Sequence, residues 1–216
     1  MRNAILSILA AAVILASCTT RKETIVPPEI VDSTTSENIA AVPSRPVTPT
    51  IPANIMGKGL VKAEILSAFL LETNQQADAD FVKDLSRLYV EEAAIEGVNH
   101  DAAFSQMCLE TGYLRFGNLV TPDMNNFCGL GAIDAEHPGE RFPTPRLGVR
   151  AHIQHLKAYA TEEPLKQDLV DPRYKWVKKG VAPTIQGLTG KWATDPDYDK
   201  KISSMLTRLY DAAFEK

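Results

Sequence analysis

The 216-residue sequence is poor in the residues and motifs that nucleic-acid, nucleotide and metal sites need. Its 23 Lys and Arg against 27 Asp and Glu give a formal charge of −4 and a pI near 5.6, so no basic face is expected. P-loop, dinucleotide-fingerprint, HExxH and CxxC patterns are all missing. Of the four histidines only His152 and His155 are close in the sequence, and no carboxylate is near them to complete a metal site. We interpret them as surface or structural histidines. We therefore expect no nucleic-acid partner, no cofactor and no metal.

Long apolar runs are also scarce, and the one that stands out is at the N-terminus. Arg2 precedes an apolar run over residues 4–15, which is too short to span a bilayer as a mature helix and is typical of a secretion signal. Residues 15–18, Leu-Ala-Ser-Cys, then resemble a bacterial lipobox, which is cleaved before its cysteine. We expect residues 1–17 to be a lipoprotein signal peptide and Cys18 to carry the lipid. The alternative is a plain signal peptide with an incidental cysteine. A lipid anchor predicts a membrane lipoprotein of the cell envelope, facing the periplasm or the surface.

Residues 18–55 have the composition of a tether. Six prolines interrupt a mixture of Thr, Ser, Val and Glu that has no helical period. Such segments stay extended and bury little. Residues 56–216 have about the length of one domain, and the hydrophobic content of the whole sequence, 44%, suffices for a core. We expect a single catalytic domain here, acting as a monomer and held away from the membrane.

Hydrophobic periodicity predicts that this domain is mainly helical. Helix-capping residues and glycines place the helix ends. The predicted helices are residues 62–72, Asp78 or Asp80 to Glu96, Asn99 or Asp101 to Gly112, Thr144-Pro145 to Ala160, and a last one that begins at Thr194-Asp195-Pro196. Between Gly112 and Pro145 the sequence is rich in Gly and Pro and has no period, which favours a loop or a short β-hairpin.

The most informative stretch is the predicted helix that stops at Gly112. Glu110 lies in its last turn, on the same face as Ala103, Gln106 and Met107. Two of these three neighbours are apolar, so we expect Glu110 to be partly desolvated, with a raised pKa. A glutamic acid that stays protonated at neutral pH is what a glycosidase requires as its general acid. The alternative is an ordinary surface glutamate at a helix end.

Four segments extend this interpretation. They are residues 91–112, which contain Glu-Thr-Gly; 125–131, Asn-Asn-Phe-Cys-Gly-Leu-Gly; 148–156; and 192–198, Trp-Ala-Thr-Asp-Pro-Asp-Tyr. Because these four segments occur in this order, the chain from about residue 62 onward resembles glycoside hydrolase family 73, the bacterial endo-β-N-acetylglucosaminidases that cut peptidoglycan. The resemblance implies a mainly α, lysozyme-like fold, with an α-helical lobe and a small β-hairpin or loop lobe.

The resemblance also implies site residues. Glu110 matches the catalytic acid of the family's Glu-Thr-Gly motif. Asn125, Asn126, Phe127 and Gly129 match the segment that lines the cleft beside that acid. Amide groups suit the acetamido and hydroxyl groups of a sugar, and an aromatic ring suits a sugar face. We expect these four residues to bind substrate.

Two departures from the family pattern bear on the mechanism. The last segment begins with Trp192 where the family usually has Tyr, and an indole stacks on a sugar but has no phenolic hydroxyl. We expect Trp192 and Tyr198 to contact substrate, with core packing as the alternative for Tyr198. The second carboxylate has no unambiguous match, so Glu136 and Glu140 are the candidates, with Asp134 nearby. Assistance by the substrate's own acetamido group is the alternative to a second carboxylate.

Two cysteines, Cys108 and Cys128, remain once Cys18 is lipidated. An exported protein permits a disulfide between them. The family fold implies that the helix end and the Asn-Asn-Phe loop lie close enough for the pair. Two buried free thiols are the open alternative, because sequence spacing does not fix the distance between the two Cα atoms.

The resemblance implies hydrolysis of β-1,4 bonds after GlcNAc in peptidoglycan or a related glycan, with Glu110 as the acid. One alternative is a lytic transglycosylase, because lysozyme-like folds also use a single Glu to make anhydro-MurNAc ends. Another is a non-catalytic glycan-binding envelope lipoprotein, which the Trp192 departure suggests. Reducing GlcNAc ends, anhydro-MurNAc ends or no products distinguish the three.

Overall fold

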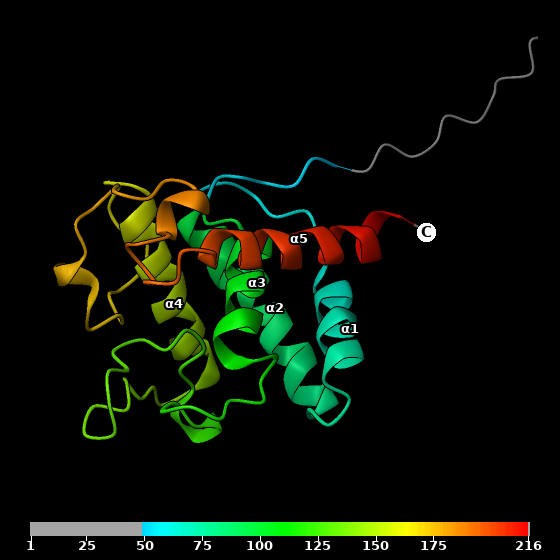
Figure 1. The fold of residues 1–216 in the computed structure, drawn as a ribbon, viewed down its shortest axis with the longest axis horizontal. Helices are drawn as coiled ribbons and strands as arrows, with labels where there is room; N and C mark the ends of the chain where they lie inside the picture. Colours follow the sequence, from blue (N-terminus) through cyan, green and yellow to red (C-terminus); the bar gives the residue numbers. More distant parts are fainter. Residues whose placement is uncertain (1–48, 216) are drawn as a thin grey trace, which may run out of the picture. The chain divides into compact units, whose positions relative to one another are not determined.

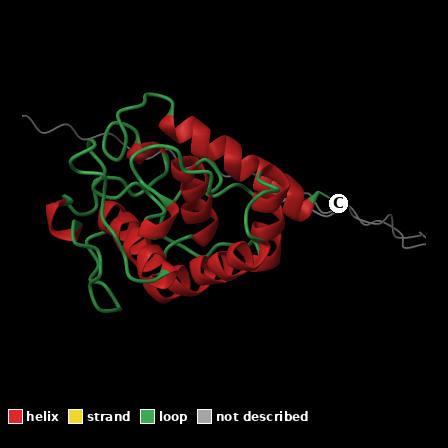
Figure 2. Ribbon diagram, turned by 90° about the horizontal axis from the view of Figure 1, so that it is seen from below, coloured by secondary structure: helices red, strands yellow, loops and turns green. Residues whose placement is uncertain are grey.

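The structure, a computed structural model, describes residues 49–215; the predicted signal peptide, Cys18 and most of the predicted tether lie outside the described residues. Five α-helices make up the described part: α1 Ala63–Thr73, α2 Ala79–Glu96, α3 His100–Thr111, α4 Pro145–Ala160 and α5 Tyr198–Phe214. Three 3-10 helices accompany them: η1 Pro122–Met124, η2 Tyr174–Trp176 and η3 Gln186–Leu188. Residues 49–215 contain isolated β-bridges but no strand (Figure 2). The prediction of a mainly α domain is confirmed, and a loop rather than a strand hairpin forms the part between α3 and α4.

Capping residues place most helix ends where the sequence predicts them. The side chains of Asp78 and Asn99 accept hydrogen bonds from the first free N–H groups of α2 and α3. Gly97 and Gly112 end the same two helices in the left-handed conformation, with φ of 77° and 58°. Thr144 caps α4 by accepting from a backbone N–H in its first turn. These ends are set by contacts within a few residues, which is why the sequence predicts them.

The predicted start of α5 is wrong by a few residues. The sequence favours a helix that begins at Thr194-Asp195-Pro196, but α5 begins at Tyr198. The side chain of Asp195 accepts from the N–H of Asp197 at 2.9 Å, which closes a turn ahead of the helix. Asp197 keeps a non-helical backbone, with φ −105° and ψ 17°. This turn delivers the Tyr198 side chain to the interior, where it is buried.

Helix α3 is the central element of the fold. It packs against α2 and α5, while α2 also packs against α1 and α4 (Figure 1). Every residue of α3 is buried except Leu109 and Glu110. The T-shaped pair of Tyr89 and Phe104, with ring centroids 5.6 Å apart, is typical of this α2–α3 contact. Because the neighbouring helices enclose α3, Glu110 is held at the rim of a rigid core.

Buried ion pairs fix α4 against α2. Lys157 on α4 donates to Glu96 on α2 at 2.9 Å, and both side chains are fully buried. Glu92 is also fully buried and accepts from Arg146 at 2.6 Å and from Arg150 at 2.9 Å. Burying charges is costly unless they are paired and hydrogen-bonded, so these contacts tolerate little displacement of one helix against the other.

The folded part starts before the predicted boundary at residue 56. Ile55 is buried, its N–H donates to Pro183 at 3.0 Å, and its carbonyl accepts from Asn99 at 2.8 Å. The last residues of the predicted tether thus pack on the domain, because an apolar side chain at this position finds a place in the core. None of the helices in residues 49–215 is long and apolar enough to cross a membrane.

Candidate active site

Glu110 lies in the last turn of α3 and is half-buried. Its Oε1 accepts a hydrogen bond from the Tyr198 hydroxyl and another from Trp192 Nε1 at 3.1 Å. Burial raises the pKa of the Glu110 carboxyl, and the two hydrogen bonds oppose that rise. The expected direction of the pKa shift is therefore confirmed, and the side chain is also fixed in orientation.

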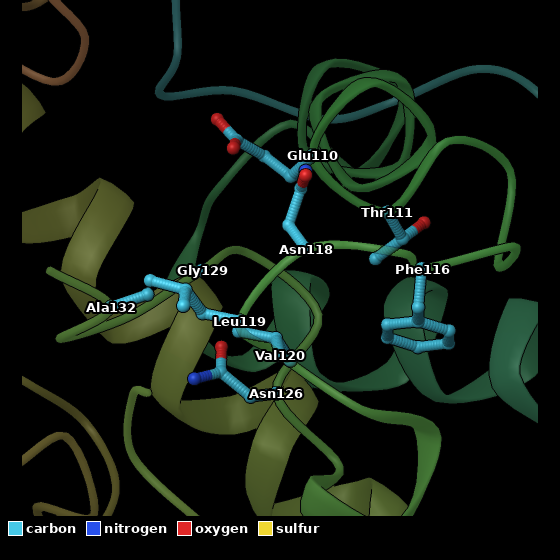
Figure 3. Close-up of a pocket in the computed structure, with 9 residues that line it drawn as sticks. All are labelled: Glu110, Thr111, Phe116, Asn118, Leu119, Val120, Asn126, Gly129 and Ala132. Carbon is cyan, nitrogen blue, oxygen red and sulfur yellow. The ribbon is translucent and has the colours of Figure 1, made fainter. Parts of the chain in front are cut away.

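Glu110 lines a pocket of about 230 Å³ between the end of α3 and the loop that follows it. Figure 3 shows Glu110 at the end of α3, with Gly129, Leu119, Val120 and Asn126 of the loop below it. The complete lining is Glu110, Thr111, Phe116, Asn118, Leu119, Val120, Asn126, Gly129 and Ala132. A concave site with one desolvated carboxyl among mostly uncharged residues suits a neutral sugar.

A second pocket of about 190 Å³ adjoins the first. The two share Gly129 and Ala132, and Trp192 in the second pocket is the residue that donates to Glu110 in the first. The second pocket is lined by Cys128, Gly129, Leu130, Gly131, Ala132, Ile133, His155, Tyr159, Arg173 and Trp192. Together the two hollows extend over the loop on both sides of Gly129, which suits a chain of sugars better than a single one.

The loop comes close to the Glu110 carboxyl at Gly129. A Cβ atom there would lie 3.8 Å from Glu110 Oε2, an ordinary contact distance, so space alone would admit a side chain. The backbone, however, has a φ of 67°, which favours glycine. Gly129 therefore gives the loop its turn beside the carboxyl.

The two predicted asparagines hold the shape of this loop through their side-chain amides. Asn126 Nδ2 donates to the carbonyls of Leu130 at 2.9 Å and Glu140 at 3.0 Å, and its Oδ1 accepts from the N–H of Leu130 at 2.9 Å. Asn125 adopts a left-handed backbone and donates to the carbonyl of Phe142 at 2.9 Å. Backbone groups of the loop thus occupy both polar atoms of the Asn126 side chain and the Nδ2 of Asn125, and the sugar contacts of these two residues stay predictions.

The predicted sugar-stacking role of Phe127 is corrected. Its ring is buried in the core and lies 6.4 Å from the ring of Phe81. Trp192 does line the cleft, as Phe116 and Tyr159 do. It is half-buried, and its ring lies 5.8 Å from His152, 5.1 Å from His155 and 5.5 Å from Tyr159. These rings hold the indole in place beside Glu110.

The structure separates the two candidates for a second carboxylate. Glu136 is exposed in a turn that Asp134 caps, where the Asp134 side chain accepts from the Glu136 N–H at 3.0 Å. Glu140 is half-buried, and its N–H donates to a loop carbonyl at 2.8 Å. A Cβ atom on Gly131 would lie 3.1 Å from Glu140 Oε1 and 3.3 Å from Arg173. Neither glutamate lines either pocket, but Glu140 lies close to Gly131 in the wall of the second pocket.

Of the two alternatives for the cysteines, the structure shows the free thiols and not the disulfide. Cys108 and Cys128 are both free and buried. Cys108 lies in the main core, while Cys128 belongs to a small apolar cluster with Leu130, Phe142 and Ala151. The two thiols are packed into different apolar surroundings, and burial raises the pKa of both.

His152 is the residue whose importance the sequence least reveals. Its ring is fully buried, and it hydrogen-bonds the Tyr89 hydroxyl at 2.9 Å and Gln106 Oε1 at 2.9 Å. Burial, with a smaller effect of His155, lowers the pKa of His152 to about 3. His152 is therefore a neutral structural histidine in the interior. This is one of the two interpretations, surface or structural, that the sequence allowed. Phe116 and residues 118–120, which also line the first pocket, carry no signal in the sequence beyond their place in a Gly- and Pro-rich loop.

Comparison with known proteins bears on this site. The family model described as Mannosyl-glycoprotein endo-beta-N-acetylglucosaminidase matches residues 86–211, more than half of the chain. An uncharacterised protein of Borreliella burgdorferi is 43% identical over 157 residues, which are 73% of this chain and 77% of that protein. The crystal structure of S. aureus autolysin E in complex with the muropeptide NAM-L-Ala-D-iGlu has a TM-score of 0.48 at 13% identity, over 75% of this chain and 74% of that one. The match of the family model, with Glu110 in the matched region, shows that this chain belongs to the endo-β-N-acetylglucosaminidases of glycoside hydrolase family 73.

Proposed function

We propose that the protein hydrolyses the β-1,4 bond after GlcNAc in peptidoglycan, with Glu110 as its general acid. The observation that carries the proposal is the state of this one carboxyl. It lines an open pocket, burial raises its pKa, and two donors fix its Oε1. A glycosidase acid needs this combination of a retained proton, a fixed orientation and access to the glycosidic oxygen.

In the first step the protonated Glu110 transfers its proton to the glycosidic oxygen as the bond to the anomeric carbon breaks. The resulting carboxylate is stabilised by the hydrogen bonds from Tyr198 and Trp192, which are already in place. Pre-placed donors of this kind need no rearrangement during the reaction. Trp192, held by its aromatic neighbours at the junction of the two pockets, provides an apolar surface for a sugar ring.

There are two candidates for the second catalytic group, which acts together with Glu110. Glu140 lies close to Gly131 in the wall of the second pocket and is the better-placed of the two candidate carboxylates. The alternative is the acetamido oxygen of the GlcNAc itself, which attacks its own anomeric carbon in substrate-assisted glycosidases. Both leave the role of Glu110 unchanged.

Digestion of purified peptidoglycan sacculi tests the function. We expect the full-length protein to release muropeptides with reducing GlcNAc ends, detected by mass spectrometry, and Glu110→Gln to release almost none. Anhydro-MurNAc ends would establish a lytic transglycosylase instead. Binding to sacculi without any released fragment would establish a glycan-binding protein and refute the hydrolase proposal.

We also propose that Cys18 carries a lipid that anchors the protein to a membrane of the cell envelope. The proposal rests on the lipobox-like residues 15–18 that follow an apolar run. Fractionation of cells that express the wild-type protein and Cys18→Ala tests it. We expect the wild type in the membrane fraction and labelled by a fatty-acid probe. A Cys18→Ala protein that is processed and retained on membranes as the wild type is would contradict the anchor.

A further inference from the structure

A line of buried side chains connects three other helices to Glu110 through successive hydrogen bonds. The Tyr89 hydroxyl on α2 meets His152 Nδ1 on α4 at 2.9 Å, and His152 Nε2 meets Gln106 Oε1 on α3 at 2.9 Å. Gln106 Nε2 donates to the Tyr198 hydroxyl on α5 at 2.7 Å, and Tyr198 donates to Glu110 Oε1. Tyr89, His152, Gln106 and Tyr198 are all buried, so water does not compete for these contacts.

The chemistry of these groups couples the directions of all four bonds. Gln106 accepts at Oε1 and donates at Nε2, so His152 must carry its proton on Nε2 and leave Nδ1 as an acceptor. Tyr89 must then donate to Nδ1. Tyr198 accepts from Gln106 and therefore has its own proton free to donate to Glu110. If the Gln106 amide is reversed, the bonds on both of its sides reverse with it: Tyr198 then donates to Gln106, and Glu110 would need a proton on Oε1 in order to donate to Tyr198.

Two groups at the ends of the line favour the direction toward Glu110. At one end Trp192 Nε1, which can only donate, contacts Oε1 at 3.1 Å and thereby disfavours a proton on that oxygen. At the other end Tyr89 has no hydrogen-bond partner except His152 among the described residues. In the reversed line the Tyr89 proton would be buried without an acceptor, which is unfavourable. Both ends therefore select the same direction.

We propose that Tyr89, His152 and Gln106, acting through Tyr198, are positioning residues that keep the acid proton of Glu110 on Oε2. Oε2 is the oxygen on the side of Gly129, 3.8 Å from where a Cβ atom on that glycine would lie, and both residues line the first pocket. None of the described residues hydrogen-bonds Oε2. This oxygen is not among the buried polar atoms without a partner, which means that it is accessible and open to the pocket.

This assignment rests on the proposed glycosidase function and specifies which oxygen of Glu110 gives up the proton. The Oε2–H bond breaks, its proton goes to the glycosidic oxygen, and that oxygen keeps the electron pair of the broken bond to the anomeric carbon. The anomeric carbon takes an electron pair from the second group, either Glu140 or the acetamido oxygen of the substrate. The line of hydrogen bonds points the same way before and after the transfer, because Oε1 accepts from Tyr198 and Trp192 in both states of Glu110. The protein thus avoids a rearrangement of buried groups in each turnover.

A matched pair of variants tests the proposal on the full-length protein. Tyr89→Phe removes the far end of the line, and Tyr210→Phe removes another buried phenol, whose hydroxyl donates to Asp101 at 2.9 Å outside the line. We expect kcat on soluble peptidoglycan fragments to fall about tenfold in Tyr89→Phe, with KM changed less than about twofold, because the acid is misoriented rather than lost. Tyr210→Phe should keep the wild-type kcat. Equal kcat values for the two variants would overturn the proposal.

A spectroscopic measurement reads the direction without any substrate. In the wild-type protein labelled with ¹⁵N-histidine, His152 should be neutral and protonated on Nε2 from pH 5 to pH 8. A proton on Nδ1, or a positively charged ring in this range, would overturn the direction even if Tyr89→Phe fails to fold. If the wild type hydrolyses peptidoglycan but His152 carries its proton on Nδ1, only the positioning role fails. If the wild type cleaves no glycan, the proposed function fails, and with it the role of the line in proton transfer.

Discussion

Replacement of Glu110 by Gln is the most direct test of the site, because the structure predicts that it removes little except the acid proton. Gln has the shape of Glu, and its Oε1 can keep accepting from Tyr198 and from Trp192. Its Nε2 then takes the place of Oε2 beside Gly129. The amide at this position donates hydrogen bonds but cannot transfer a proton to a leaving group.

The size of the expected loss follows from that single change. General acid catalysis contributes roughly a hundredfold to ten-thousandfold to the rate, which corresponds to about 2.7 to 5.4 kcal/mol of transition-state stabilisation. We expect the release of reducing GlcNAc ends from sacculi to fall by this factor in Glu110→Gln. Glu136→Gln is the matched control, since Glu136 is an exposed loop glutamate outside both pockets.

The same substitution has a second, pH-dependent effect on stability. Burial raises the pKa of Glu110 in the folded state, so folding favours the protonated form. Below the pKa of the unfolded chain Glu110 is protonated in both states and carries no penalty. As the pH rises through the folded pKa, the wild type must ionise a buried carboxyl, which the Gln variant avoids. We expect equal Tm values for the two proteins at pH 4 and a higher Tm for Glu110→Gln at pH 8, measured by thermal denaturation.

Activity and stability together decide how the result is interpreted. A folded Glu110→Gln variant that still releases muropeptides at near the wild-type rate would refute the acid role. Lost activity with a collapsed melting transition would indicate a structural role for Glu110. Lost activity with a Tm that rises relative to the wild type at high pH is the outcome that the geometry predicts.

Two further predictions concern the loop and the core. On sacculi, Glu140→Gln should lose more activity than Glu136→Gln, because Glu140 lies close to Gly131 in the wall of the second pocket; near-wild-type rates for both would favour substrate assistance or Asp134. In urea unfolding, Lys157→Met should lower the free energy of unfolding by about 3 to 5 kcal/mol, since it leaves Glu96 buried without its counter-charge. Lys83→Met, which breaks an exposed ion pair, should cost under about 1 kcal/mol, and similar losses in both Lys variants would contradict the importance of burial.

Local signals explain why much of the helical framework can be predicted from the sequence. Asp78 and Asn99 satisfy the first N–H groups of their helices through their own side chains, and Gly97 and Gly112 supply the left-handed backbone at the helix ends. Both kinds of signal act within a few residues. The position of Glu110 at a helix end, with apolar neighbours on its face, follows from the same signals. So does the direction of its pKa shift.

The loop between α3 and α4 shows where such reasoning fails. Asn126 and Phe127 belong to a motif whose chemistry suits a sugar, yet Asn126 satisfies loop backbone groups and Phe127 packs in the core. The order of residues in a loop does not reveal which side chains face inward. That choice depends on what the loop packs against, here α2 and the start of α4, where Gly148 leaves room for the Asn125 carbonyl.

The sequence by itself determined the five helices, most of their ends and Glu110 as the candidate acid, because each depends on periodicity, caps or one short motif. Only the tertiary structure decided how that acid is held. Trp192 and Tyr198 reach Glu110 from 82 and 88 residues away along the chain, and His152 joins them through Gln106. Hydrogen bonds of this kind depend on how four helices pack in three dimensions, and no spacing within a single helix encodes them.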